Sequence, residues 1–152
     1  MSIQDRLAEL GIVLPSAAAP AANYVPFVHY GGLLHISGQL PFAEDGSLPR
    51  GRLGEEVDLA AGQAAAARCA IGIVAQIAVA GALEHVARFI KLGIFVASTP
   101  GFTDQPKVGN SASDLLVQVF GDAGRHARSA VGVAVLPLGV PVEIDAIVAL
   151  TG

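Results

Sequence analysis

The chain has little charge for its length. Only 14% of its 152 residues are Asp, Glu, Lys or Arg, whereas 53% are hydrophobic. A chain this apolar is not intrinsically disordered, and its length suits one domain, residues 1–152, with a core of its own. A lone monomer usually exposes more charge, so we expect another copy of the chain to cover part of the surface.

Basic residues are scarce and scattered. The nine Lys and Arg residues are outnumbered by 13 acidic ones, which gives a formal net charge of −4. Nucleic-acid binding needs clustered Lys and Arg to neutralise phosphates, and the sequence has no basic run and no basic stripe interleaved with aromatic residues. The composition therefore argues against a nucleic-acid partner.

Cysteine is almost absent, with Cys69 the single example. One thiol excludes a disulfide within the chain, disfavours a thiol-based metal site and indicates a reducing, intracellular compartment. The four histidines, at positions 29, 35, 85 and 126, lack the spacing and the neighbouring carboxylates of metal ligands. We therefore predict neither a metal nor a cofactor.

The sequence also lacks a long hydrophobic run. The start, "MSIQDRLAELGIVLP", has no basic region followed by an apolar stretch, as an export signal would. The longest apolar segment, "CAIGIVAQIAVAGAL", is shorter than a membrane span and contains Gln76. We expect a buried helix there, no membrane partner and a cytoplasmic protein.

Local patterns predict strands and helices in the order ββ, helix, β, helix, ββ. Residues 1–20 form an N-terminal extension with a short helix in "RLAEL" and a loop or arm in "PSAAAPAA". A hairpin is expected around Gly31–Gly32, a long helix from Val57 to about Ala80, and a strand in "HVARFIKLGIFVAS". This is one α+β domain with its helices on one face of the sheet.

The C-terminal third is predicted to contain a helix and a hairpin. Ser111 and Asp114 resemble a capping box that starts a helix ending near Gly121 or Gly124. The stretch "GRHARSAVGVAVLPLGVPVEIDAIVAL" then indicates two apolar strands joined near Leu138, each with one unexpected charge, Arg128 and Glu143.

The segments "YVPFV", "ISGQLP" and "HARSAVGVAVLPLGVPVEIDAI", together with Asn110, resemble the RidA/YjgF family, also called the L-PSP endoribonuclease family. The resemblance covers roughly residues 20–150. It implies a chorismate-mutase-like α+β fold, a mixed sheet with two helices packed on one face. It also implies a homotrimer with a central β-barrel and a cleft at each subunit interface.

The resemblance further implies an activity and its residues. The best-characterised branch hydrolyses reactive enamine or imine intermediates, such as 2-aminoacrylate, to a 2-oxo acid and ammonia. Arg128 matches the arginine that holds the substrate carboxylate, Glu143 the glutamate near the attacking water, and Tyr24 a pocket tyrosine. The positions bordering the substrate are matched by Ser37, Gly38, Asn110 and the backbone amide of Ala130.

This chemistry suits the side chains, because a guanidinium binds a carboxylate with two charge-assisted hydrogen bonds and an iminium carbon is already electrophilic. The chain departs from the family at Ala130, where cysteine is common, and at His126, where proline is frequent. The segment "TPGFTDQPKVGN" is a longer loop than the family core has.

Other interpretations remain open from the sequence. Arg128 could be a solvent-facing or acid-paired charge on an edge strand, Glu143 a barrel-lining or interface residue, and Tyr24 a core residue. A non-catalytic protein that binds a small carboxylate, an imino acid or a 2-oxo acid, would use the same arginine. The endoribonuclease of the family's older name fits badly with the acidic net charge.

A geometric expectation concerns Arg128 and Glu143. A hairpin centred near Leu138 would place Arg128 opposite about Val148 and Glu143 opposite about Val133. The two residues would then lie roughly 17 Å apart along the ladder, at ~3.4 Å per residue. We therefore predict that they meet across a subunit boundary and not within one chain.

Overall fold

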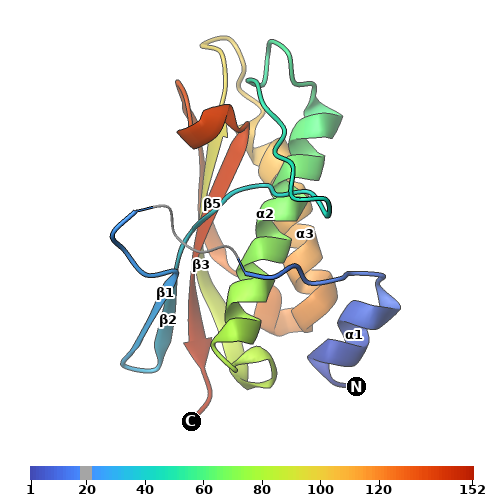
Figure 1. Cartoon of the computed structure of the whole chain (residues 1–152), viewed down its shortest axis with the longest axis vertical. Coiled ribbons are helices and arrows are strands. Elements are labelled where there is room, and N and C mark those ends of the chain that lie inside the picture. Colours follow the sequence, from blue (N-terminus) through green and yellow to red (C-terminus); the bar gives the residue numbers. More distant parts are fainter. Residues whose placement is uncertain (18–21) are drawn as a thin grey trace.

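The structure, a computed structural model, describes residues 1–17 and 22–152. Its elements form a sheet covered by helices on one face only (Figure 1). In chain order they are α1 (Ile3–Glu9), β1 (Phe27–Tyr30), β2 (Leu33–Gln39), α2 (Leu59–Val79), η1 (Leu83–His85), β3 (Val86–Ala97), α3 (Gln105–Phe120), η2 (Gly121–Gly124), β4 (Ala127–Val133), η3 (Pro137–Gly139) and β5 (Val142–Leu150).

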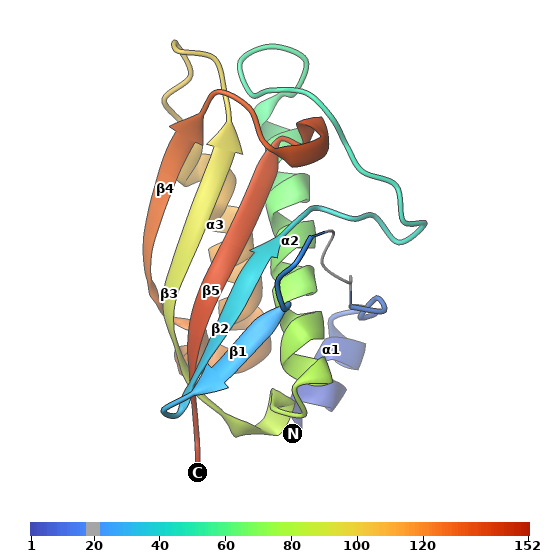
Figure 2. The ribbon, with the colours of Figure 1, turned by 60° about the vertical axis from the view of Figure 1, so that its left-hand side comes forward.

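The five strands form one mixed sheet in the order β1-β2-β5-β3-β4. The β3–β4 pair is parallel and the other pairs are antiparallel, and Figure 2 shows the strands side by side with α2 and α3 behind them. The predicted α+β class and the two helices on one face are confirmed. The short helix α1 is a third helix and packs beside α3.

The first hairpin forms as the glycine pair predicts. Gly31 and Gly32 both have positive φ, 63° and 77°, which suits a two-residue hairpin turn and is accessible at little cost only to glycine. The turn sets the register in which Phe27 lies opposite Ile36 and Tyr30 opposite Leu33.

The long helix α2 confirms the predicted helix and fills the centre of the core. It begins after Asp58, whose carboxylate accepts from the Ala61 N–H at 2.8 Å. It is long and apolar enough to cross a membrane by length and composition alone, yet 61% of the relevant window is buried inside the domain. Cys69 is fully buried in it, as expected for a small core residue.

The predicted start of the next helix is wrong. Helix α3 begins at Gln105, six residues before Ser111, so half of the predicted loop "TPGFTDQPKVGN" is helical. Pro106 lies in the first turn, where its missing N–H costs nothing. Ser111 lies inside the helix and its hydroxyl donates to the Gln63 carbonyl of α2, so tertiary contact outweighs the capping pattern.

The predicted C-terminal hairpin is also wrong. β4 pairs in parallel with β3, and β5 pairs with β3 on its other side, so β3 separates the two strands. Arg128 therefore lies opposite Leu92, not Val148, and Glu143 lies opposite Phe95, not Val133. The helix α3 connects β3 to β4 as a β–α–β crossover, which delivers β4 to the outer edge.

The N-terminal segment is anchored through α1. Ser2 and Asp5 form a capping box, and the Glu84 carboxylate accepts from the Ile3 N–H at 3.0 Å. Part of the predicted extension and of its arm, residues 18–21, lies outside the described residues.

Candidate functional site

Arg128 lies on the edge strand β4 and points towards α3. Its strand partner Leu92 is fully buried, so both side chains are on the helix-covered face. The guanidinium donates from Nη2 to the Pro106 carbonyl at 3.1 Å and to Asn110 Oδ1 at 2.9 Å, and from Nη1 to Ser113 Oγ at 3.0 Å. Because positions 106, 110 and 113 follow helical spacing, one face of α3 supplies all three acceptors.

A glycine of α3 gives the guanidinium its space. A methyl group at Gly109 would lie 3.2 Å from Arg128 Nη1 and 2.9 Å from Ile94 Cδ1. The close approach of α3 to β4 therefore depends on the absence of a side chain at position 109.

The charge of Arg128 is held by neutral groups alone. Its three acceptors are a carbonyl, an amide oxygen and a hydroxyl, and among the described residues no carboxylate forms a salt bridge with it. The interpretation of Arg128 as an acid-paired edge charge is therefore wrong. A cation fixed in position but not neutralised is suited to binding an anion.

The backbone amide of Ala130 is placed to donate to the same anion as Arg128. The Val133 carbonyl accepts from the Ser98 N–H at 3.0 Å, so Val133 directs its backbone groups towards the β3 side. The two-residue period of the strand then directs the amides of Arg128 and Ala130 outwards from the sheet. Since β4 is an edge strand, these donors meet no further strand within residues 1–17 and 22–152.

Glu143 lies on the other face of the sheet. It is opposite Phe95, three positions from Leu92, and β5 alternates buried and half-buried residues so that Glu143 faces away from the helices. Partial burial raises the pKa of its carboxyl group, and the neighbouring carboxylate of Asp145 raises it further. The group is therefore easier to protonate than an ordinary glutamate, which suits proton transfer.

Gly38 lies beside this carboxylate at an irregularity of β2, directly after Ser37. The β2–β5 register shifts between Ile36 and Gln39, and a methyl group at Gly38 would overlap the Glu143 carboxylate. Ser37 Oγ donates to the Val25 carbonyl at 2.9 Å, which ties β2 to the segment before β1. The absence of a side chain at Gly38 therefore leaves room for the Glu143 carboxylate.

Tyr24 lies in the segment tied down by Ser37. It is 52% exposed, so the interpretation of Tyr24 as a core residue is wrong. Its ring is available on the surface near the end of β2.

The predicted site residues thus form two groups in one chain. We call Asn110, Arg128 and Ala130 the arginine half, and Tyr24, Ser37, Gly38 and Glu143 the glutamate half. β4 and β5 lie on either side of β3, so they are two strand spacings apart. Along β3, the partner of Glu143 (Phe95) is three residues from the partner of Arg128 (Leu92). The two Cα atoms are therefore about 14 Å apart, with side chains on opposite faces. Arg128 and Glu143 therefore do not meet within one chain, although the predicted hairpin was wrong. That they meet across a subunit boundary stays a prediction.

The sequence reasoning missed two residues of the arginine half, Ser113 and the carbonyl of Pro106. Helical spacing from Asn110 could have found both, but only with the helix start placed at Gln105. It also missed Asp145, whose own pKa is raised by burial. The alternation of β5 places Asp145 on the same face as Glu143, and this signal was present in the sequence.

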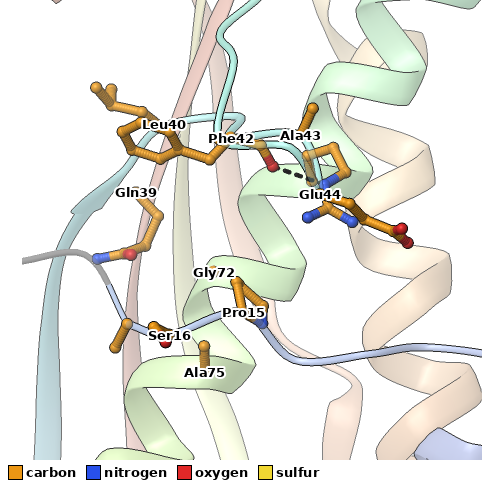
Figure 3. Close-up of a pocket in the computed structure, with 12 residues that line it drawn as sticks. Pro15, Ser16, Gln39, Leu40, Phe42, Ala43, Glu44, Gly72 and Ala75 are labelled. Atoms are coloured by element: carbon orange, nitrogen blue, oxygen red, sulfur yellow. Dashed lines mark hydrogen bonds between the residues drawn. The ribbon is translucent and has the colours of Figure 1, made fainter.

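A separate cavity of about 280 Å³ lies between residues 15–17, the loop after β2 and helix α2 (Figure 3). Arg68 Nε donates to the Phe42 carbonyl at 2.7 Å on its wall, and Gly72 and Gln39 contribute to the lining. None of the seven predicted site residues lines it. Over the described part of the chain, no group of three or more His, Cys, Asp or Glu side chains is placed to hold a metal ion.

Comparison with known proteins identifies the fold. The family described as "YjgF/chorismate mutase-like, putative endoribonuclease" matches residues 4–147. The chain belongs to the YjgF/RidA family. Among curated relatives, protein TCP17 of Trypanosoma cruzi is 53% identical over 97% of this chain and 94% of its own length.

Two solved structures of the YjgF/RidA type illustrate the range of sequence identity and structural similarity. Protein Atu1372 of Agrobacterium tumefaciens has a TM-score of 0.89 at 50% identity, covering 97% of this chain and 92% of its own. Escherichia coli TdcF, solved with bound serine, has a TM-score of 0.63 at 26% identity, covering 90% of this chain and 94% of its own.

Proposed function

We propose that the protein is a hydrolytic deaminase of reactive enamine and imine metabolites, releasing a 2-oxo acid and ammonia. The observation that carries the proposal is the state of Arg128, a guanidinium fixed by three neutral acceptors on α3 with no carboxylate partner among the described residues. With the outward amide of Ala130, it forms a preorganised site for a carboxylate.

Each half of the site has a distinct task. The arginine half binds the substrate carboxylate and orients the C=N bond. Water adds to the imine carbon, a proton moves to nitrogen, and the resulting carbinolamine expels ammonia to leave the C=O group. Glu143, with its raised pKa, takes a proton from the water and returns it to the leaving nitrogen. The substrate supplies its own electrophile, so positioning and proton transfer account for the chemistry.

The relative with bound serine supports a ligand of this class. TdcF of E. coli holds serine, a small molecule with a carboxylate and a nitrogen on the adjacent carbon. A three-carbon imino acid has the same carboxylate and the same nitrogen position. This likeness favours a small amino-acid-derived substrate over a polynucleotide for this chain.

The two halves require association between copies. The arginine half lies at the β4 edge, whereas the glutamate half extends towards the β1 edge, so a head-to-tail contact would join unlike surfaces and close into a ring. The open face has exposed apolar side chains that such a contact would cover, with Val28 50%, Tyr30 82% and Val131 45% exposed. We propose a homotrimer, so light scattering should give three times the chain mass of 15.4 kDa.

The direct test is turnover. An amino-acid lyase or oxidase generates 2-aminoacrylate or a larger imino acid, and release of the 2-oxo acid is followed with and without the protein. Acceleration that is lost in the Arg128→Ala protein supports the deaminase. Binding of a 2-oxo acid that depends on Arg128, with no acceleration for any imino acid, would replace this proposal with a carboxylate-binding protein.

A further inference from the structure

A chain of hydrogen bonds runs from the end of η2 to the guanidinium of Arg128. His126 Nδ1 lies 2.6 Å from the Gly124 carbonyl, and His126 Nε2 lies 2.9 Å from Ser113 Oγ. Ser113 Oγ in turn accepts from Arg128 Nη1 at 3.0 Å. Both Ser113 and His126 are half-buried between α3 and the start of β4. The site described above does not use His126.

The chemistry of these groups fixes the position of every proton. A carbonyl only accepts, so the Gly124 carbonyl requires a proton on His126 Nδ1. In the neutral ring, Nε2 is then an acceptor, and it must receive the hydroxyl proton of Ser113. The hydroxyl can therefore not rotate, and its lone pairs remain directed at Arg128 Nη1.

The Gly124 carbonyl, at the far end of these hydrogen bonds, is held in place by packing. A methyl group at Gly124 would overlap the Leu116 carbonyl oxygen and lie 2.6 Å from its carbonyl carbon, so the backbone of Gly124 packs against the backbone of α3. The carbonyl that orients His126 is thus held by the same helix that supplies the acceptors of Arg128.

We propose that Ser113 and His126 are positioning residues that set the plane of the Arg128 guanidinium for carboxylate binding. Two of the three contacts of Arg128 are made by Nη2 alone, to Pro106 and Asn110. The side chain holds the guanidinium through Nε, and the bond from Nη1 to Ser113 adds the contact that fixes the second terminal nitrogen. His126 acts one step further out, because it fixes the Ser113 hydroxyl.

The electrostatics agree with a neutral ring. Burial lowers the pKa of His126, the positive charge of Arg128 lowers it further, and the Gly124 carbonyl opposes both effects. A protonated ring would present a second donor to Ser113 Oγ and a second cation to Arg128. In the neutral form the serine hydroxyl donates to His126 Nε2 and accepts from Arg128 Nη1, so the ring adds no second positive charge beside the arginine.

The inference rests on the proposed function for its kinetic test. Ser113→Ala should raise the KM for an imino acid by about 5- to 20-fold, with kcat changed by less than about 2-fold. Ser113→Thr keeps the hydroxyl and should restore the KM to within about 2-fold of wild type. Ser111→Ala is the matched control, because Ser111 lies in the same helix as Ser113, but its hydroxyl donates to the Gln63 carbonyl of α2 and not to a partner of Arg128.

The order of the hydrogen bonds, from His126 through Ser113 to Arg128, gives a second test. His126→Leu should raise the KM like Ser113→Ala, and His126→Gln, which keeps an acceptor, should recover part of the loss. The double variant Ser113→Ala/His126→Leu should be no worse than Ser113→Ala, because both changes remove the same contact. Additive losses in the double variant would mean that His126 does not act through Ser113, and would overturn the inference.

A measurement that needs no turnover separates this inference from the deaminase proposal. NMR of ¹⁵N-labelled arginine side chains reports rotation of the Arg128 guanidinium, which should be slow in wild type and faster in Ser113→Ala. Faster rotation without imine hydrolysis in wild type would retain the positioning role and reject the deaminase. Wild-type turnover with neither faster rotation nor a KM change in Ser113→Ala would reject the positioning role and leave the deaminase intact.

Discussion

Mixing of two inactive variants tests whether the arginine half and the glutamate half come from different copies. Under the proposed mechanism, Arg128→Ala removes the carboxylate anchor and Glu143→Ala removes the proton carrier, so neither variant should be active in the proposed homotrimer. Within one chain the two residues are about 14 Å apart and on opposite faces of the sheet, so a small substrate cannot contact both. A complete site must then take one residue from each of two neighbours.

The expected recovery follows from counting interfaces. In a head-to-tail ring, each interface combines the arginine half of one copy with the glutamate half of the next. In trimers assembled at random from equal amounts, about half of the copies retain Arg128 and about half of their neighbours retain Glu143. About a quarter of all interfaces in the unselected mixture should therefore be intact. A ring that contains both variants has one intact interface of its three, so mixed trimers isolated through both tags should recover about a third of wild-type turnover.

The assay needs verified mixed assemblies. The two variants, carrying different affinity tags, are denatured together, refolded and purified through both tags, and 2-oxo acid release from 2-aminoacrylate is compared with each parent. Mixing wild type with Arg128→Ala gives the control for loss of activity on refolding. Mixed trimers with no more turnover than the parents would refute the shared site.

Further variants test the individual groups. Arg128→Ala should lower kcat/KM by about 100-fold or more, because the charge-assisted contact with the substrate carboxylate is lost. Arg125→Ala, which removes the same charge from a side chain paired with Asp122, should not; equal losses in steady-state assays would contradict the assignment. Glu143→Gln should raise the melting temperature at about pH 8 and have no effect at about pH 4, because a raised folded-state pKa means that stability is lost as the pH rises through it; an equal shift at both pH values would argue against a buried ionised carboxylate. Gly38→Ala should abolish turnover in a folded trimer by displacing the Glu143 carboxylate, whereas Gly101→Ala, at an open position, should leave both turnover and circular dichroism unchanged.

Several elements could be predicted because their signals are local. The glycine pair at 31–32 determines a tight hairpin through backbone sterics, and the apolar period of α2 determines a buried helix. The motif around Arg128 and Glu143 was sufficient to indicate the family, which the match over residues 4–147 shows. Each of these features depends on residues that are close together in the sequence, so it can be predicted from a single sequence.

The two wrong predictions, the start of α3 and the C-terminal hairpin, both depend on which other segment a helix or strand contacts. Ser111 and Asp114 satisfy a capping pattern, but the helix extends back to Gln105 because Pro106 suits its first turn and Ser111 contacts α2. The turn near Leu138 predicted a hairpin, yet the crossover through α3 places β3 between the two final strands. Local turn chemistry cannot show which strand a given edge will meet.

The sequence by itself determined the class of the domain, the order of its strands and helices, and the identity of the candidate anion-binding and proton-transferring residues. Only the tertiary structure decided that Arg128 packs on α3 while Glu143 faces the opposite side of the sheet. The reason is physical: side-chain type and backbone preference are properties of a residue and its neighbours, whereas the face and the partner of a strand depend on contacts between residues far apart in the chain.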